Sequence, residues 1–161
     1  MQDIIGRLNA KKAELDEKRG DEGFTLIELL VVVVIIGVLV AIAVPVYLNY
    51  RQGAADKSAQ SDVRGAISAV EQFYTSNGNT YPATTSAAAG ATSLTLTAIS
   101  GSAGTITLSD KSQLGYVYNS TAGTYKICAN NTGGSGKWYI YDSAVGGSVK
   151  ASTATLTISA C

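Results

Sequence analysis

The sequence predicts an α+β fold in which one long N-terminal α-helix, membrane-spanning in its first half, packs on a small antiparallel β-sheet. Three observations lead to this prediction. An uncharged run extends from Leu29 to Val46, which is long enough to cross a bilayer as a helix. After Arg51, apolar residues recur at steps of three and four, the period of an amphipathic helix. Short alternating segments separated by Gly-containing turns then follow, and these are typical of antiparallel strands.

The first half of the helix, residues 24–50, is apolar on every side. We expect one continuous helix from Phe24 to about Thr75, because a chain in lipid must satisfy its backbone hydrogen bonds internally. Such an all-apolar surface needs lipid or other helices around it. Gly37 and Pro45 are its weak points, since a proline donates no hydrogen bond and presses on the carbonyl one turn earlier. A kink or a locally melted stretch between them would make the helix flexible.

The second half of the helix, residues 51–76, carries a single apolar stripe that should lie across a sheet. The stripe consists of Ala59, Val63, Ala66, Ile67, Val70, Phe73 and Tyr74. The charged residues of this segment are expected on its other faces: Asp56, Lys57, Asp62, Arg64 and Glu71. Asn77-Gly78 supplies the end of the helix, because glycine suits the left-handed position that follows a last turn.

Residues 77–161 are predicted to form a globular β-domain. It opens with a connector at 83–103 that is rich in Ala, Ser, Thr and Gly and holds one short strand around Ser93–Ala98. The other strands are expected at Thr105–Ser109, Tyr116–Asn119, Thr124–Ala129, Trp138–Tyr141 and Thr155–Ser159. The short links between them favour an antiparallel meander. A domain of about 80 residues has a marginal core, so the helix must contribute to it.

The two cysteines, Cys128 and Cys161, are too far apart for the C-x-x-C patterns of redox and zinc sites. Beyond the membrane, oxidation is possible. We therefore expect one disulfide, which ties the C-terminus back to a strand and closes a C-terminal loop. The alternative is a pair of buried free thiols.

Composition limits the classes of function. The 161 residues suffice for one globular domain with appendages. Zero net charge argues against a general nucleic-acid surface, and the lack of histidine removes the commonest general base and metal ligand. The carboxylates beyond the helix, Asp110 and Asp142, form no evident pair for hydrolysis. We expect no enzyme activity, no cofactor, no metal site and no specific nucleic-acid partner.

Residues 1–23 form a polar leader that holds five basic and six acidic residues. The basic residues before the apolar run outnumber those just after it, which are Arg51, Lys57 and Arg64. By the positive-inside rule, this bias favours a single-pass orientation with the N-terminus in the cytoplasm.

The leader meets the apolar run in the sequence Gly23-Phe24-Thr25-Leu26-Ile27-Glu28. A carboxylate inside a membrane span costs roughly 2.5–3.5 kcal/mol on insertion scales, so Glu28 is expected to have a function and a partner. Cleavage after Gly23 would create that partner, because it frees a positive amine at Phe24. Two other interpretations remain: a secretory signal cleaved at Ala41-Ile42-Ala43, or a plain anchor with an accidental glutamate.

The same arrangement, with Gly37 and Pro45 inside the helix, resembles the processing signal of type IV pilins and the related pseudopilins. The resemblance implies the pilin fold, cleavage between Gly23 and Phe24 by a prepilin peptidase, and N-methylation of Phe24. It also implies that Phe24 and Glu28 guide docking between subunits. In a packed assembly, the amine of an incoming subunit would pair with Glu28 of a neighbour and set the axial register.

The function implied by this resemblance is that of a structural subunit of a type IV pilus-like surface filament. The chain would span the membrane once before assembly and lie in an extracellular filament afterwards. Implied partners are further copies of the chain, the peptidase/methylase, a membrane platform protein and a cytoplasmic assembly ATPase.

One alternative is a pseudopilin of a type II secretion or DNA-uptake system. A second, of a different class, is a membrane-tethered adhesin or sugar-binding module that uses aromatic residues of neighbouring strands. These residues are Tyr116, Tyr118, Tyr125, Trp138, Tyr139 and Tyr141. For any one of them, packing in the core or across strands is the expected role.

Overall fold

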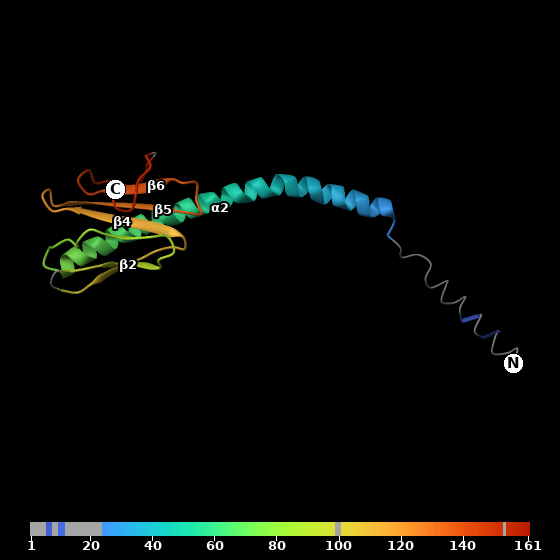
Figure 1. Ribbon diagram of the computed structural model, residues 1–161, viewed down its shortest axis with the longest axis horizontal. Coiled ribbons are helices and arrows are strands. Elements are labelled where there is room, and N and C mark those ends of the chain that lie inside the picture. Colours follow the sequence, from blue (N-terminus) through green and yellow to red (C-terminus); the bar gives the residue numbers. More distant parts are fainter. Residues whose placement is uncertain (1–5, 8–9, 12–23, 99–100, 153) are drawn as a thin grey trace. The chain divides into compact units, whose positions relative to one another are not determined.

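The computed structural model describes residues 6–7, 10–11, 24–98, 101–152 and 154–161 (Figure 1). Most of the predicted leader, including Gly23, lies outside the described residues. The chain forms two compact units, Met1–Pro45 and Val46–Cys161. The second unit contains the sheet and the half of the helix that packs on it.

A single long helix, α2, runs from Leu26 to Ser76. It ends one residue after the predicted position, and Gly78 beyond it has the positive φ of 64° that the Asn77-Gly78 stop requires. Every residue from Gly37 to Pro45 is helical, so the expected local melting is absent from the single chain. A proline removes only one hydrogen bond of the helix, and the bonds on either side maintain the turn. Flexibility at these two residues stays a prediction.

The C-terminal half of α2 buries one stripe against the strands, as the periodicity predicts. Five apolar residues of the helix are at most 3% exposed: Ala59, Val63, Ala66, Val70 and Phe73. Ile67 packs against this core from its edge. Tyr74 stacks on Tyr81, with the ring centroids 4.4 Å apart. The α+β fold with a helix packed on an antiparallel sheet is thereby confirmed.

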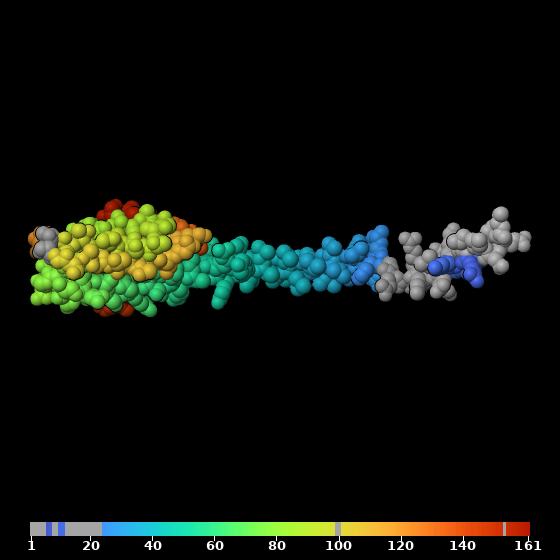
Figure 2. Space-filling model, turned by 90° about the horizontal axis from the view of Figure 1, so that it is seen from below, coloured from blue at the N-terminus to red at the C-terminus, as the bar shows by residue number. Residues whose placement is uncertain are grey.

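The strands form two antiparallel sheets. The larger has the order β1-β4-β5-β6-β7, and the smaller pairs β2 with β3. The strand bounds are β1 Thr85–Ala87, β2 Ser93–Leu96, β3 Gly104–Thr107, β4 Ser112–Asn119, β5 Thr124–Asn131, β6 Trp138–Asp142 and β7 Lys150–Ser152. β2 and β3 lie beside the helix in Figures 1 and 2, and Leu94, Leu96 and Ile106 share the core with Phe73.

The sequence predicts β2 to β6 but misplaces three other features. The expected strand at 155–159 does not form, and that segment contributes only a bridge between Thr157 and Ala160. β1 lies inside the predicted connector and β7 follows a Gly-rich loop, and neither was predicted. Both are three-residue edge strands, which are too short to show an alternating pattern.

The C-terminal segment instead crosses the outer face of the sheet. Cys128 and Cys161 form the disulfide that the sequence predicts. A side chain at Gly115 in β4 would overlap the carbonyl oxygen of Ile158, so glycine is what allows the segment to lie this close. The predicted strand fails because its backbone packs across the sheet rather than along an edge.

Two acidic residues of the helix are buried, although the sequence places them on exposed faces. Asp56 is 6% exposed and accepts hydrogen bonds from the backbone N–H and the hydroxyl of Ser135, at 2.9 and 2.5 Å. Asp62 is 7% exposed and accepts from the backbone N–H and the hydroxyl of Ser109, at 3.2 and 2.7 Å. Burial is tolerated because each carboxylate gains two donors from a loop.

A third acid of the helix, Glu71, lies on the surface and reaches the aromatic core. The Tyr125 hydroxyl donates to Glu71 Oε1 at 2.6 Å, and the Tyr125 residue is 1% exposed. Burial, and secondly this hydrogen bond to a carboxylate, raise the pKa of Tyr125 above its usual range.

We expect Gly115→Ala to destabilise the fold by about 1–3 kcal/mol, because the added methyl group displaces the C-terminal segment from the sheet. Gly65→Ala is the matched control. Gly65 is an exposed helical residue with open space at its Cβ position, so alanine should stabilise the helix there by about 0.5–1 kcal/mol. Urea denaturation of the purified protein in detergent measures both changes, and equal effects of the two substitutions would contradict this account.

The raised pKa of Tyr125 predicts a loss of stability in alkali. Above about pH 10 the phenol ionises in the unfolded chain but stays protonated in the folded one, so the free energy of unfolding falls as pH rises. Below that pH the two states bind the same proton and the effect vanishes. Tyr125→Phe should make the decline above pH 10 shallower by about 1.4 kcal/mol per pH unit. Denaturation curves on both sides of pH 10 test this, and an unchanged slope would contradict it.

Candidate functional site at the start of the helix

Thr25 and Glu28 close the first turn of α2 by reciprocal hydrogen bonds. The backbone N–H of Thr25 donates to Glu28 Oε2 at 2.8 Å, and the backbone N–H of Glu28 donates to Thr25 Oγ1 at 3.3 Å. The Thr25 hydroxyl also donates to the same carboxylate oxygen, at 2.7 Å. This is a capping box, which satisfies two N–H groups that have no partner inside the helix. It explains why the helix begins at Leu26.

The capping box leaves half of the Glu28 carboxylate available. Oε2 carries both hydrogen bonds from Thr25, whereas Oε1 accepts none from the described residues. Among the described residues, the only ion pair joins Lys126 to Asp142 at 3.3 Å. None of the described basic residues therefore pairs with Glu28. The carboxylate is therefore oriented at the helix N-terminus with one oxygen free to accept a donor from outside.

No other part of the described chain covers the helix around this carboxylate. All side chains from Phe24 to Ala54 are exposed, including 21 consecutive residues from Leu26 to Val46 with only Glu28 charged. Among the described residues, α2 is one helix that is long and apolar enough to cross a membrane. Figure 2 shows the side chains of this half of the helix at the surface. A carboxylate is thus presented on a surface that water solvates poorly.

The structure brings together only some of the residues that the sequence marks. Phe24 is 75% exposed and lies one turn before Glu28, so the amine that cleavage would free starts close to the carboxylate of the same chain. Gly37 and Pro45 lie farther along α2 and touch neither residue, because they are more than two turns away. Gly23 lies outside the described residues.

The role of Thr25 in the capping box was not predicted from the sequence. The pattern Thr-x-x-Glu directly before an apolar run is a recognisable signal for a capping box. The reciprocal hydrogen bonds with Thr25 show that Glu28 stabilises the start of the helix, in addition to any contact that it makes with another subunit.

The strands of the β-domain expose little aromatic surface, which argues against the alternative of a sugar-binding site there. Tyr116, Tyr125, Trp138 and Tyr139 are at most 7% exposed, and the two remaining aromatic residues of these strands are partly buried against the core. The predicted core role of these residues is confirmed, and most of the surface on which a sugar could stack is therefore absent.

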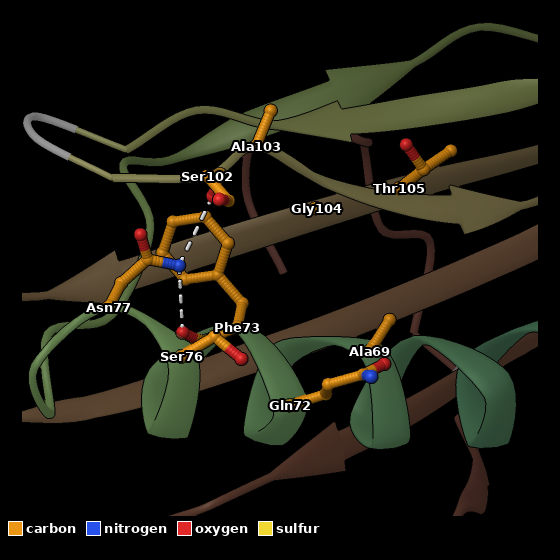
Figure 3. A pocket seen from close by; sticks show the side chains of 9 residues that line it. All are labelled: Ala69, Gln72, Phe73, Ser76, Asn77, Ser102, Ala103, Gly104 and Thr105. Atoms are coloured by element: carbon orange, nitrogen blue, oxygen red, sulfur yellow. Dashed lines mark hydrogen bonds between the residues drawn. The ribbon is translucent and has the colours of Figure 1, made fainter.

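A pocket of about 250 Å³ lies between the last turns of α2 and the start of β3 (Figure 3). Its lining residues are small or neutral, and none of them carries an ionisable side chain. Asn77 bridges its two walls, because its Nδ2 donates to the carbonyl oxygens of Phe73 and Ser102 at 2.9 and 3.2 Å. The hydroxyl groups in the pocket therefore have no ionisable lining residue beside them that could act as a general base.

One comparison with known proteins falls on the region that contains the start of the helix. The family profile described as the prokaryotic N-terminal methylation motif matches residues 18–44. The chain is 40% identical over 72 residues to a fimbrial protein of Neisseria meningitidis, covering 45% of this chain and 42% of that protein. No solved structure matches the chain.

Two further relatives show the breadth of the similarity. The chain is 42% identical over 57 residues to the type IV major pilin protein PilE1 of Neisseria gonorrhoeae, covering 35% of this chain and 34% of the pilin. It is 37% identical over 68 residues to the type II secretion system core protein G of Aeromonas hydrophila, covering 42% of this chain and 47% of that protein. The chain thus spans less than half the length of these curated relatives.

The methylation-motif match covers the start of the apolar N-terminal helix, and the second half of that helix packs on the antiparallel sheet. In these features the chain is similar to the type IV pilin proteins and to the type II secretion system core protein G.

Proposed function

We propose that this chain is the precursor of a structural subunit of a type IV pilus-like surface filament. Its first 23 residues would be removed between Gly23 and Phe24, Phe24 would be N-methylated, and the apolar half-helices of many copies would form the filament core. This role needs no catalytic residue and no cofactor.

The observation that carries this proposal is the exposure of every side chain from Phe24 to Ala54. A helix that is apolar all round is stable only in lipid or among other helices. Before assembly, the bilayer would surround it, and after assembly, the helices of neighbouring subunits would do so. Contacts that join unlike faces of successive copies and do not close into a ring produce an open filament.

The Glu28 carboxylate, which has one oxygen without a hydrogen bond, would fix the axial register of the apolar contact between neighbouring helices. The freed amine of an incoming subunit would donate to Oε1 of a Glu28 already in the filament, while Thr25 keeps Oε2 in place. Two unit charges 4 Å apart attract by about 4 kcal/mol at an effective dielectric constant of 20. A subunit seated one turn out of place would leave both charges unpaired in an apolar core, which costs about 3–5 kcal/mol.

Processing and assembly require other proteins. We infer that a prepilin peptidase/methylase acts on Gly23 and Phe24, and that a platform protein and a cytoplasmic ATPase drive extrusion. The excess of basic residues ahead of the apolar run supports a cytoplasmic N-terminus, with the β-domain on the far side of the membrane.

A second candidate within the same superfamily is a pseudopilin of a short secretion or DNA-uptake fibre. It is favoured by the similarity to the core protein G of Aeromonas hydrophila. Electron microscopy of sheared surface fibres, with peptide identification, separates the candidates: long fibres of this chain indicate a pilin, short stubs a pseudopilin, and monomers only would contradict assembly.

The first prediction concerns processing. Mass spectrometry of the exported protein should find a mature N-terminus at Phe24 with one added methyl group. A start at Val44 would indicate a secretory signal cleaved after Ala41-Ile42-Ala43, and a start at Met1 a plain anchor. Either result would contradict the proposed precursor.

The second prediction separates the charge of Glu28 from its capping role. Glu28→Gln removes the charge but can still accept hydrogen bonds from Thr25, because glutamine also serves in a capping box. Thr25→Ala keeps the charge and removes the cap, at about 0.5–2 kcal/mol of helix stability. We expect Glu28→Gln to be cleaved normally but to enter filaments poorly, by about tenfold or more, whereas Thr25→Ala assembles.

The measurement is the ratio of filament to membrane pools of each variant, co-expressed with tagged wild-type chain. The reverse pattern, in which Glu28→Gln assembles like wild type and Thr25→Ala does not, would show that Glu28 acts only through the helix start.

A further inference from the structure

We propose that the end of the β-domain nearest to the apolar half-helix is a docking surface for the anionic phospholipid headgroups of the leaflet from which the helix emerges. We call this surface the basic rim, and it consists of Arg51, Lys57, Lys111 and Lys137. The inference rests on the membrane span and is independent of whether the chain later forms a filament.

The first argument is the place where the helix leaves the hydrocarbon. The run without a polar side chain ends at Val46, and Tyr47 and Tyr50 follow, 59% and 79% exposed. Tyrosines of this kind anchor helices at the membrane–water interface. The guanidinium of Arg51 lies 5.9 Å from the centre of the Tyr47 ring. At about 1.5 Å per residue, Arg51 stands about 8 Å above Val46, which is at the outer edge of the headgroup layer.

The second argument is that the fold brings two loop lysines to the same level of the helix. Asp56 binds the loop 132–137 through Ser135, and a side chain at Gly134 would collide with that carboxylate. This loop therefore lies against α2 only about 15 Å above Val46. Lys137, at its end, is exposed.

Lys111 lies in the adjoining turn before β4. Its carbonyl oxygen accepts the backbone N–H of Thr132 at 3.0 Å, and its side chain passes beside Gly133. Lys111 is exposed and has a positive φ of 60°, which places it at the tip of the turn. In Figure 1 the start of β4 and the end of β5 lie together beside α2. Lysines from two loops thus join the cations of the helix.

The third argument is the balance of charge at this end of the domain. None of the four cations of the basic rim takes part in an ion pair with a described residue, whereas the more distant Lys126 is paired with Asp142. The nearby carboxylates of Asp56 and Asp62 are buried and accept hydrogen bonds from the neutral Ser135 and Ser109, so they reduce the positive potential of this end without being exposed on it. The exposed carboxylate of Asp110 is the one other acid in these two loops. A cationic surface that stands within about one Debye length of the headgroups is complementary to anionic lipid.

The basic rim would hold the β-domain down on the leaflet before the helix is withdrawn from it. Each basic residue near an anionic surface strengthens binding about fivefold. Because this attraction is screened by salt, it is reversible and does not oppose extraction as a buried contact would.

The test uses the full chain in nanodiscs that hold one copy each, so that no neighbouring subunit can cover the basic rim. The discs contain phosphatidylcholine alone or phosphatidylcholine with phosphatidylglycerol. Amine-reactive labelling followed by mass spectrometry reports each lysine. We expect Lys111 and Lys137 to be labelled about fivefold more slowly in the anionic discs, with this protection lost at high salt. Lys126 and Lys150, which lie farther along the strands, should be labelled equally in both discs.

Variants supply the matched control. Amide exchange of the loop 132–137 should be slower in anionic discs for wild type and for Lys126→Gln/Lys150→Gln, but equal in the two discs for Lys111→Gln/Lys137→Gln. Both pairs remove the same charge from exposed positions and leave the backbone bonds of the loops intact. Equal labelling of Lys111 and Lys137 in both discs would overturn the proposal. So would equal protection of all four lysines, or protection of the loop that survives Lys111→Gln/Lys137→Gln.

Discussion

The first half of α2 has to be covered by something other than its own chain. Its side chains are apolar on every face, and all of them are exposed from Phe24 to Ala54. The segment therefore needs lipid or other helices around it. In both, only a helix satisfies the backbone, which explains why a stretch so rich in Val and Ile is helical despite its intrinsic preference for strands. The sheet and the loops pack only against the second half of the helix, and the disulfide holds the C-terminal segment on the sheet.

Most of the correct predictions from the sequence depend on hydrophobic patterns among residues that are close together in the chain. The apolar run, the stripe from Ala59 to Phe73 and the alternating strands each depend on residues close together in the chain, so their periods are visible without a structure. The candidate site at Phe24 and Glu28 could be proposed for the same reason, because its residues fall within one turn of helix, and its role in assembly stays a prediction. Even there, the capping role of Thr25 emerges only from the hydrogen bonds, although the Thr-x-x-Glu pattern was present.

Contacts between distant segments are what the sequence could not reveal. Asp56 and Asp62 were expected at the surface, because nothing near them in the sequence indicates a hydrogen-bond donor. Their donors, Ser135 and Ser109, follow them by 79 and 47 positions. The path of the C-terminal segment depends on the absence of a side chain at Gly115. An alternating pattern there was compatible with a strand, yet the segment packs across the face of the sheet instead of pairing along an edge. Hydrophobic periodicity assigns faces, but it does not show which polar groups a loop will satisfy.

The two buried carboxylates also decide how the domain responds to traction. If α2 slid along the sheet by one turn, about 5.4 Å, Asp56 and Asp62 would both lose their donors while still enclosed, at about 1–3 kcal/mol or more each. An apolar stripe alone would resist such slippage weakly, because one methyl group replaces another. A force along α2 therefore meets this added resistance before the helix can slip past the sheet, whereas the helix ahead of Asp56 has no such contacts with the β-domain.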